Sequence, residues 1–560
     1  MKMVKSLLLG TAAGLVAVSA GQAADLPVKA KPVEYVKVCT LYGSGFYYIP
    51  GTDVCIKLGG FIRTEIDFHA QGSFAPFVGN NANAFQTRSE DNYITRARAY
   101  LTADVREQTS YGTLRGYLAA GWQYSSDDAP TLSLPAFQAT GTSTHAGAGI
   151  TNTFVGGGNG NVSILRAFIQ LGGFTFGKTA SFYDFFNTSK YSLQSNFIYQ
   201  DFAGVGIFTY GYTQQLGNGF AFTIAAQDPS PFENNIVDVN PAPAAGPFAF
   251  SSTTATAPTV NLGTTSNVFL PGASNDINNA GTLVPDFVAS LRVDQTWGGA
   301  QVAAIAHDNR ALYYNQSGFG VLKGSDHPSD KWGFAVQGGL ELNLGGWGWF
   351  FAKGDSFAIQ SQYCEGASYA CYQRSGNRFV DNGWQLVNVH TVGLGWVDDA
   401  FYASPGAIKG VSASGPAHGL ELSTTWNVWA AIQHYWFPEV RTSLYGGYVN
   451  YKANSSAVDN LICAPLNAGH AAGGLPVQTP GAVAATGCAD WAAWAVGSRT
   501  LWNPTKNLDV GVDVLYTTMA KSAFSGATVN TLGAGTPATL TTGDTHIWAG
   551  ILRVQYNFYP

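Results

Sequence analysis

The stretch from residue 56 to residue 68 alternates between apolar and polar side chains. One face carries Ile56, Leu58, Gly60, Ile62, Ile66 and Phe68, and the other carries Lys57, Arg63, Glu65 and Asp67. A period of two residues is that of a β-strand, whose successive side chains point to opposite faces of the sheet. We therefore predict a strand here, with one face suited to an apolar environment and the other to water.

The next two stretches repeat this alternation. From 95 to 106 the charged face carries Arg96, Arg98, Asp104 and Arg106, and from 113 to 123 it carries Arg115. The alternation alone fits two structures, a soluble sandwich with its apolar face inside and a membrane barrel with its apolar face outside.

The lengths of the connections favour the barrel. Long connections are expected at about 69–92, 126–160, 181–203, 229–284, 310–329, 361–418, 453–489 and 520–544, and short ones near Thr109, Gly172, Leu216, Gly298, Gly345, Tyr435 and Pro504. The two kinds alternate strictly, which predicts eight hairpins, or sixteen strands. Long loops on one rim, short turns on the other and an even strand count are typical of outer-membrane barrels. Residues 385–398 also alternate, but a seventeenth strand could not close an up-and-down barrel, so we place them within the sixth long loop as a short hairpin or insertion.

Composition supports this fold class, an all-β, 16-stranded antiparallel transmembrane β-barrel. Only 11% of the residues are charged, against about 25% in an ordinary soluble domain. No apolar run of the mature chain approaches the ~20 residues that a spanning helix needs, and the other structure that satisfies its backbone hydrogen bonds in a bilayer is a closed barrel. The net charge of −6 excludes the basic signature of a nucleic-acid-binding protein.

The N-terminus predicts export. Lys2 and Lys5 precede an apolar run that ends near Ala20, and small residues follow it, so residues 1–23 are expected to be a signal peptide. Residues 24–53 form an irregular lead-in, and residues 54–560 the barrel. The six cysteines fall into close pairs, which in an oxidising compartment predicts three local disulfides. These pairs are Cys39 with Cys55, Cys364 with Cys371, and Cys463 with Cys488.

The third long connection, about residues 181–203, is the candidate functional element. Inside a wide barrel it can fold back into the lumen and narrow it. Its aromatic residues are expected to pack the loop against the inner wall rather than to bind a ligand; they are Phe182, Tyr183, Phe185, Phe186 and Tyr191.

The pore constriction is expected where charged wall residues face this loop, because charged rings at the narrowest point set selectivity. Strand parity points arginines inward from the first four strands, and the loop offers two acidic residues. The candidates are Arg63, Arg96, Arg98, Arg115, Arg166, Asp184 and Asp201. Any single arginine could instead pair with a wall carboxylate such as Glu65, Asp67 or Asp104, and that alternative stays open here.

The chain resembles the trimeric porins of alphaproteobacteria, the rhizobial and brucella type. The resemblance is carried by ADLPVKA from Ala24 to Ala30, VCTLYGSGFYYIPGTDVCIKLGG from Val38 to Gly60, and RAFIQLGGFTFGKTASFYDFF from Arg166 to Phe186. It implies a homotrimer in the outer membrane, in contact with lipid and lipopolysaccharide, whose third loop narrows each lumen. Passive diffusion of ions and small hydrophilic solutes is then the expected function.

Signals for other functions are weak. The glycine-rich run 156–160 lacks the Lys-Ser/Thr of a phosphate-binding loop, and the nine histidines are scattered without metal-ligand spacing, so neither an enzyme, a cofactor nor a metal site is predicted. A pore specific for a sugar or an anion, and a secreted all-β binding or adhesion protein, are the alternatives. Tryptophans in the second half are expected in an interfacial girdle or at subunit contacts; they are Trp347, Trp349, Trp426, Trp429, Trp436, Trp491 and Trp494.

Overall fold

The computed structural model describes most of the chain. The described residues are 37–68, 93–125, 160–185, 188–194, 206–239, 260–262, 279–314, 326–348, 350–372, 383–388, 391–407, 414–415, 418–464, 483–526, 528–531 and 539–558. The expected signal peptide and residues 24–36 of the lead-in lie outside them. Among the described residues, no helix combines the length and the apolar character that crossing a membrane requires.

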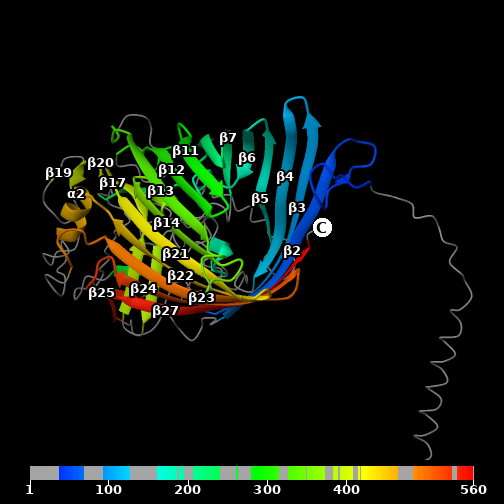
Figure 1. Ribbon diagram of the computed structural model, residues 1–560. Helices are drawn as coiled ribbons and strands as arrows, with labels where there is room; N and C mark the ends of the chain where they lie inside the picture. The colour runs from blue at the N-terminus through cyan, green and yellow to red at the C-terminus, as the bar shows by residue number, and fades with distance from the viewer. Residues whose placement is uncertain are drawn as a thin grey trace, which may run out of the picture.

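Sixteen antiparallel strands form one closed barrel, as predicted (Figure 1). They are β2 (Cys55–Phe68), β3 (Tyr93–Thr109), β4 (Gly112–Ser125), β5 (Gly160–Leu171), β6 (Phe174–Thr179), β7 (Ile207–Gly217), β8 (Phe220–Gln227), β11 (Asp286–Gln295), β12 (Gly298–Asn309), β13 (Lys331–Asn343), β14 (Ser356–Glu365), β21 (Thr424–Phe437), β22 (Val440–Lys452), β23 (Trp491–Thr505), β24 (Leu508–Lys521) and β27 (Thr545–Phe558). Each pairs with its neighbour along this series, and β27 pairs with β2, from Gly60 opposite Phe558 to Phe68 opposite Gly550, which closes the barrel. A two-residue strand, β1 (Tyr47–Tyr48), adds to the start of β2.

The alternation along β2 assigns its two faces. Leu58, Ile62 and Phe68 are exposed on the outer face, whereas Glu65 and Asp67 are buried on the inner face. A soluble sandwich would have the reverse arrangement. Apolar side chains outside and charged side chains inside are the arrangement that suits lipid around the barrel and water within it.

One rim carries short turns and the other carries long loops. The turns 110–111, 172–173, 218–219, 296–297, 438–439 and 506–507 each have two residues. The turn expected near Gly345 is an exception: it runs from 344 to 355, between β13 and β14. The prediction of a tight turn there was wrong, because the glycines lie within a longer connection, in which Gly346 and Gly348 have positive φ angles.

The alternating segment 385–398 forms a hairpin that is not part of the barrel wall but packs against its inner face, where a Cβ atom at Gly395 would lie 2.8 Å from the Trp491 ring. Its strands are β15 (Gly383–Asn388) and β16 (Thr391–Trp396). They join a five-stranded sheet with strands from two other long loops, β10 (Val260–Leu262), β25 (Thr528–Thr531) and β26 (Thr539–Thr542). The prediction of a short hairpin within the sixth long loop is therefore confirmed.

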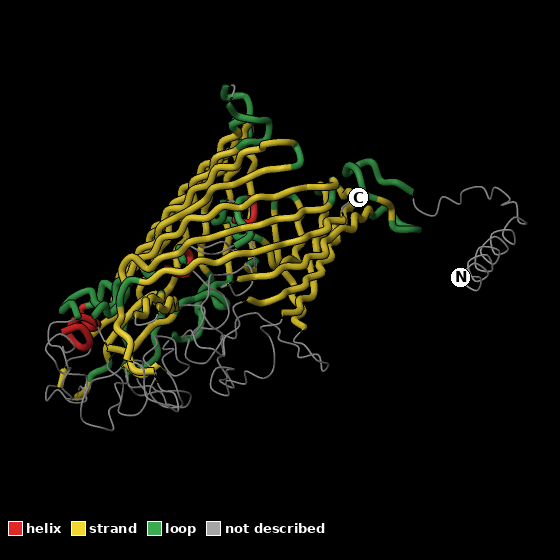
Figure 2. Tube along the Cα trace, turned by 90° about the horizontal axis from the view of Figure 1, so that it is seen from below, coloured by secondary structure: helices red, strands yellow, loops and turns green. Residues whose placement is uncertain are grey.

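A second small sheet, which we call the mouth sheet, comes from two loops of the same rim. It consists of β9 (Asn235–Asp238), β17 (Asp398–Ala403) and β20 (His418–Leu422), in the order β20-β17-β9. Every residue of β17 is buried. A two-stranded ribbon of β18 (Gly406–Ala407) and β19 (Ser414–Gly415) lies between β17 and β20 along the chain. Helix α2 (Ser456–Val458) lies at the same end of the barrel, opposite the C-terminal end of β27 (Figures 1 and 2).

The three predicted disulfides are confirmed. Cys39–Cys55, Cys364–Cys371 and Cys463–Cys488 have Cα–Cα distances of 6.1, 6.0 and 5.5 Å. The first ties the lead-in to the start of β2. Cys364–Cys371 closes a short loop at the end of β14, and Cys463–Cys488 lies in the connection between β22 and β23, both on the long-loop rim.

The tryptophans do not all lie on the outside. Trp347, Trp426, Trp436 and Trp494 are exposed, whereas Trp429 and Trp491 are buried in the barrel interior. For those two the girdle prediction was wrong, because Trp429 and Trp491 have the inward parity of their strands. Trp349 lies outside the described residues.

Candidate pore constriction

The loop between β6 and β7 starts along the inner wall of β8 and β12. The Ser181 hydroxyl donates to Gln227 Oε1 at 2.8 Å. The Gln301 side-chain amide, on β12, donates to the carbonyl oxygens of Tyr183 and Asp184 at 3.0 and 3.1 Å. Wall side chains thus satisfy loop backbone groups that would otherwise be buried without partners.

Glycines in the wall make room for the aromatic rings of this segment. A Cβ atom at Gly339, on β13, would lie 2.4 Å from Phe185 Cδ1, and one at Gly211, on β7, would lie 2.6 Å from Phe182 Cε2. Arg292, on β11, covers the Phe185 ring at 5.1 Å and donates to the Phe185 carbonyl at 3.0 Å. The packing role expected for Phe182, Tyr183, Phe185 and Tyr191 agrees with their burial; Phe186 lies outside the described residues.

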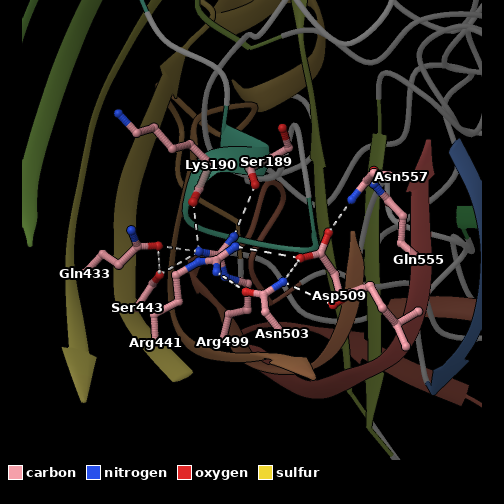
Figure 3. A network of polar contacts seen from close by, with 11 residues as sticks. Ser189, Lys190, Gln433, Arg441, Ser443, Arg499, Asn503, Asp509, Gln555 and Asn557 are labelled. Carbon is pink, nitrogen blue, oxygen red and sulfur yellow. Dashed lines mark hydrogen bonds and ion pairs between the residues drawn. The ribbon is translucent and has the colours of Figure 1, made fainter. Parts of the chain in front are cut away.

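The second described part of the loop, residues 188–194, crosses to the opposite strands. It begins with a 3-10 turn, η3 (Thr188–Lys190). The Arg499 guanidinium, on β23, donates to the carbonyl oxygens of Ser189 and Lys190 at 3.1 and 2.8 Å, and also to Gln433 and Ser443 at 2.8 Å (Figure 3). One buried cation therefore holds the loop to the wall.

One carboxylate and a second arginine add to this attachment. Asp513, on β24, accepts from the Leu193 backbone N–H at 2.5 Å and from the Ser192 hydroxyl at 3.2 Å. Arg553, on β27, donates to the Leu193 carbonyl at 3.1 Å. The Leu193 side chain packs with Leu501 and Ile551.

Tyr191 fixes the middle of the segment. Its hydroxyl donates to Glu341 Oε1, on β13, at 2.6 Å. Burial, with the Glu341 carboxylate next to it, raises the pKa of Tyr191 above its usual range, so the hydroxyl remains a donor. Lys190 pairs with the same carboxylate. We call the set Arg499, Asp513, Arg553 and Glu341 the loop anchor.

Two of the predicted arginines lie opposite each other in one row of the wall. The register places Arg63 of β2 beside Arg98 of β3, with Gln555 of β27 and Gln123 of β4 on either side. Each arginine Nε donates to the neighbouring glutamine Oε1 at 2.6 Å. Like charges directly opposite each other are unfavourable in a sheet, so this row concentrates positive charge at a cost to stability.

Arg96 and Arg115 point inward but form ion pairs with wall carboxylates. Arg96 is 3% exposed and contacts Glu65 at 2.7 Å, and Glu65 also accepts from Arg553 at 2.7 Å. Asp104 accepts two hydrogen bonds from Arg115, both 3.0 Å. For these two arginines the structure has the pairing that the sequence left open.

The structure describes two of the three remaining candidates, Arg166 and Asp184, but not the third. Arg166 follows a bulge in β5 and donates to the Leu165 carbonyl at 2.6 Å. Asp184 lies in the first turn of the loop, where its backbone is held by Gln301. Asp201 lies outside the described residues.

Sequence reasoning missed the loop anchor. Its members lie on β13, β23, β24 and β27, whereas the parity argument selected arginines only from the first four strands. Arg499, Asp513 and Arg553 each have the inward parity of their strands, so the same argument applied to the whole chain would have found them.

The barrel, the loop inside it and the charged wall agree with a comparison to known proteins. The model of the family described as "Porin subfamily" matches residues 25–551. The chain belongs to this porin family. The resemblance inferred from its motifs is thereby confirmed, and the barrel has its place in the outer membrane of a Gram-negative cell.

Individual relatives of this porin match over part of their length. Porin Omp2a of Brucella melitensis is 32% identical over 234 residues, 40% of this chain and 56% of that protein. The putative outer membrane protein y4fJ of Sinorhizobium fredii is 30% identical over 181 residues, 32% of this chain and 43% of that protein. The chain thus spans about half the length of the curated relatives that it matches. The solved outer membrane channel DcaP of Acinetobacter baumannii, at 12% identity and covering 91% of this chain and 99% of that one, has a TM-score of 0.47, too distant for its pore lining to be aligned.

Proposed function

We propose that this porin forms a passive, water-filled channel for ions and small hydrophilic solutes across the outer membrane. The observation that carries the proposal is the anchored segment 188–194, which extends from η3 at Arg499 to Leu193 at Arg553 on β27. A loop fixed across part of the lumen limits the size of solutes while leaving the rest of the lumen open. Membership of the porin family indicates a channel rather than an enzyme.

We also propose that Arg63, Arg98 and Arg166 line the narrowest part, with the acidic loop residues Asp184 and Asp201 contributing the opposite charge. The Arg63–Arg98 row supports this, because two cations held in register by glutamines create a strong local potential. In this proposal Arg96 and Arg115 contribute less, since Glu65 and Asp104 offset part of the positive charge beside them; each carboxylate also pairs with a second arginine, Arg553 and Arg106.

The channel proposal is tested by swelling of liposomes that contain the purified protein. Neutral sugars and amino acids of increasing size should enter at rates that fall with size and depend little on chemical type. Folded protein that supports no swelling would overturn the proposal. Swelling by one chemical class alone would favour the solute-specific alternative.

We propose that three copies assemble, as the resemblance to trimeric porins implies, with lipid and lipopolysaccharide around them. Chemical crosslinking of the detergent-solubilised protein should give a ladder that ends at the trimer. A ladder that ends at the monomer would contradict this assembly.

A further inference from the structure

The opposed arginines Arg63 and Arg98 lie together without a carboxylate of the described wall between them. They are register partners on β2 and β3, and side chains directly opposite each other on one face of a sheet have Cβ atoms about 4.5–5.5 Å apart. The nearest carboxylate along β2, Glu65, already pairs with Arg96 and Arg553, each at 2.7 Å. Like charges held so close destabilise a sheet, so an anion between the two guanidiniums would stabilise this part of the wall.

A chain of side-chain hydrogen bonds fixes the guanidinium of Arg63. Its Nε donates to Gln555 Oε1 at 2.6 Å, the Gln555 amide donates to Asn557 Oδ1 at 2.6 Å, and the Asn557 amide donates to Asp509 at 2.7 Å (Figure 3). Arginine only donates and an ionised carboxylate only accepts, so each bridging amide has a single orientation that satisfies both neighbours. The chain therefore holds the Arg63 side chain in one position.

Aromatic packing and a second glutamine complete this arrangement. The Phe61 ring lies 4.8 Å from the Arg63 guanidinium carbon and stacks on the Tyr100 ring at 5.1 Å. Arg98 Nε donates to Gln123 Oε1 at 2.6 Å, on the other side of the arginine pair. Among the described residues, no acceptor binds the two terminal nitrogens of Arg63. Its planar fork is thus held in place with donors that the described part of the chain does not use.

The chemistry of this pair suits a tetrahedral oxyanion. A guanidinium presents parallel N–H donors that match the oxygens of a phosphate or a carboxylate. A carboxylate has two oxygens in one plane and satisfies one such fork, whereas a phosphate or sulfate group has oxygens on several sides and can bridge two. Because the glutamines and the Phe61 ring already orient the forks, binding costs little side-chain entropy.

We propose that Arg63 and Arg98 form a binding site for a tetrahedral oxyanion, a sulfate or a phosphate group, between their guanidiniums. This site depends on the proposed channel function, and it gives the channel a class of solute that it binds during passage. A general positive potential attracts every anion according to its charge, whereas this site favours anions that bridge two guanidiniums. Passage continues because the bound anion can still leave toward either side.

The test is the chloride current through single channels of the purified protein as sulfate is added. Chloride concentration and ionic strength are kept constant while potassium sulfate replaces potassium acetate, the salt of a planar carboxylate. Sulfate bound between the arginines excludes chloride from the same position. We expect the current to fall with sulfate and to level off once the site is saturated.

Arg63→Lys keeps the charge but removes the fork. We expect it to raise the sulfate concentration that gives half of the effect about tenfold, as the loss of one charged hydrogen bond would. The reversal potential in potassium chloride should stay close to that of the unchanged protein, because the charge is retained. Arg106→Lys is the matched control, because Arg106 is another inward arginine, on β3, and pairs with Asp104 at 2.8 Å. Its half-effect concentration should equal that of the unchanged protein.

A chloride current that is independent of sulfate, or that falls at the same sulfate concentrations in Arg63→Lys, would overturn the site while leaving the channel intact. Absence of chloride current before sulfate is added would contradict the channel and the site together. If Arg63→Lys does not fold, Gln555→Leu removes the acceptor of Arg63 Nε and should raise the half-effect concentration severalfold. An unchanged concentration in that variant would also overturn the site.

Discussion

Arg63 and Arg98 show how single residues set the charge of the wall. They lie opposite each other on β2 and β3, and each is oriented by a glutamine on the next strand. The neighbouring inward row has a different balance, because Glu65 there lies between Arg96 and Arg553. The Arg63–Arg98 row therefore carries two positive charges without a carboxylate between them, whereas Glu65 offsets one of the two charges in the neighbouring row.

We predict that Arg63→Gln and Arg98→Gln each shift the permeability ratio toward cations, and that the double variant shifts it further. Each substitution removes a positive charge from the proposed constriction. The measurement is the reversal potential in a salt gradient. Lys506→Gln, on a two-residue turn at the rim, removes the same charge away from the wall row and should change little. Reversal potentials equal to that of the unchanged protein in all three variants would mean that these arginines do not line the constriction.

A second residue-scale prediction concerns the loop anchor. Arg499→Ala removes the donors to the Ser189 and Lys190 carbonyls, and hydrogen bonds from charged groups contribute about 1.5–3 kcal/mol each. We expect segment 188–194 to detach part of the time, which raises the mean conductance and adds current noise. Arg441→Ala is the matched control, because Arg441 bonds to Asn503 in the same network and makes no contact with the loop among the described residues. Quiet currents in Arg499→Ala, like those of the control, would contradict the anchoring role.

At the scale of elements, the wall of β13 is adapted to the loop that it holds. Gly338 and Gly339 are adjacent, but a Cβ atom at Gly338 would meet nothing within 4 Å, whereas one at Gly339 would meet the Phe185 ring. The two glycines therefore provide a matched pair of substitutions.

We predict that Gly339→Ala displaces Phe185 and lowers the free energy of unfolding by roughly 1–3 kcal/mol, the usual cost of overpacking. Gly338→Ala should have no such cost, because its methyl group points to the outside. Heat-induced unfolding in detergent, followed by gel mobility, measures both. The same transition temperature for the two variants would show that the ring does not depend on the space at Gly339.

The mouth sheet should respond to pH through Asp399. Burial raises the pKa of this carboxyl to about 7, from about 3.9 in an unfolded chain. The ordered sheet therefore binds a proton that the disordered segment releases, so its stability falls as pH rises from about 4 to about 7 and is constant above that range. Asp399→Asn should remove this dependence. Hydrogen exchange of the β9 and β17 amides at about pH 5 and about pH 8, corrected for intrinsic rates, measures it. Equal pH dependence in the variant and the unchanged protein would assign the effect to other groups.

At the scale of the whole molecule, the barrel could be predicted because the sequence patterns that indicate its strands and turns are local. A period of two residues and the alternation of long and short connections are visible in the sequence, and they located fifteen of the sixteen strands to within a few residues; β14, expected to begin just after Gly345, begins at Ser356. The twelve-residue turn was missed, because Gly345 and Gly346 are as compatible with a tight turn as with the longer one.

The contacts inside the barrel could not be predicted in the same way. Glu65 pairs with Arg96 and also with Arg553. The pair with Arg553 depends on the register between β2 and β27, which lie at opposite ends of the chain. The mouth sheet joins β9 and β17 in parallel from two different loops, and no local pattern encodes such a pairing. Phe185 and Tyr191 of the third loop share one apolar cluster with Phe401 of the mouth sheet and Trp491 of the wall, so these parts of the third loop and the mouth sheet pack as one unit.

The most direct test of the channel is the single-channel conductance of the purified protein in a planar bilayer. We predict stepwise insertions, grouped in threes, with a conductance nearly proportional to that of the bulk salt solution, because ions then cross a water-filled lumen that the third loop narrows but does not close. Folded, inserted protein that carries no current would contradict this account, since the third loop or the mouth sheet would then seal the barrel.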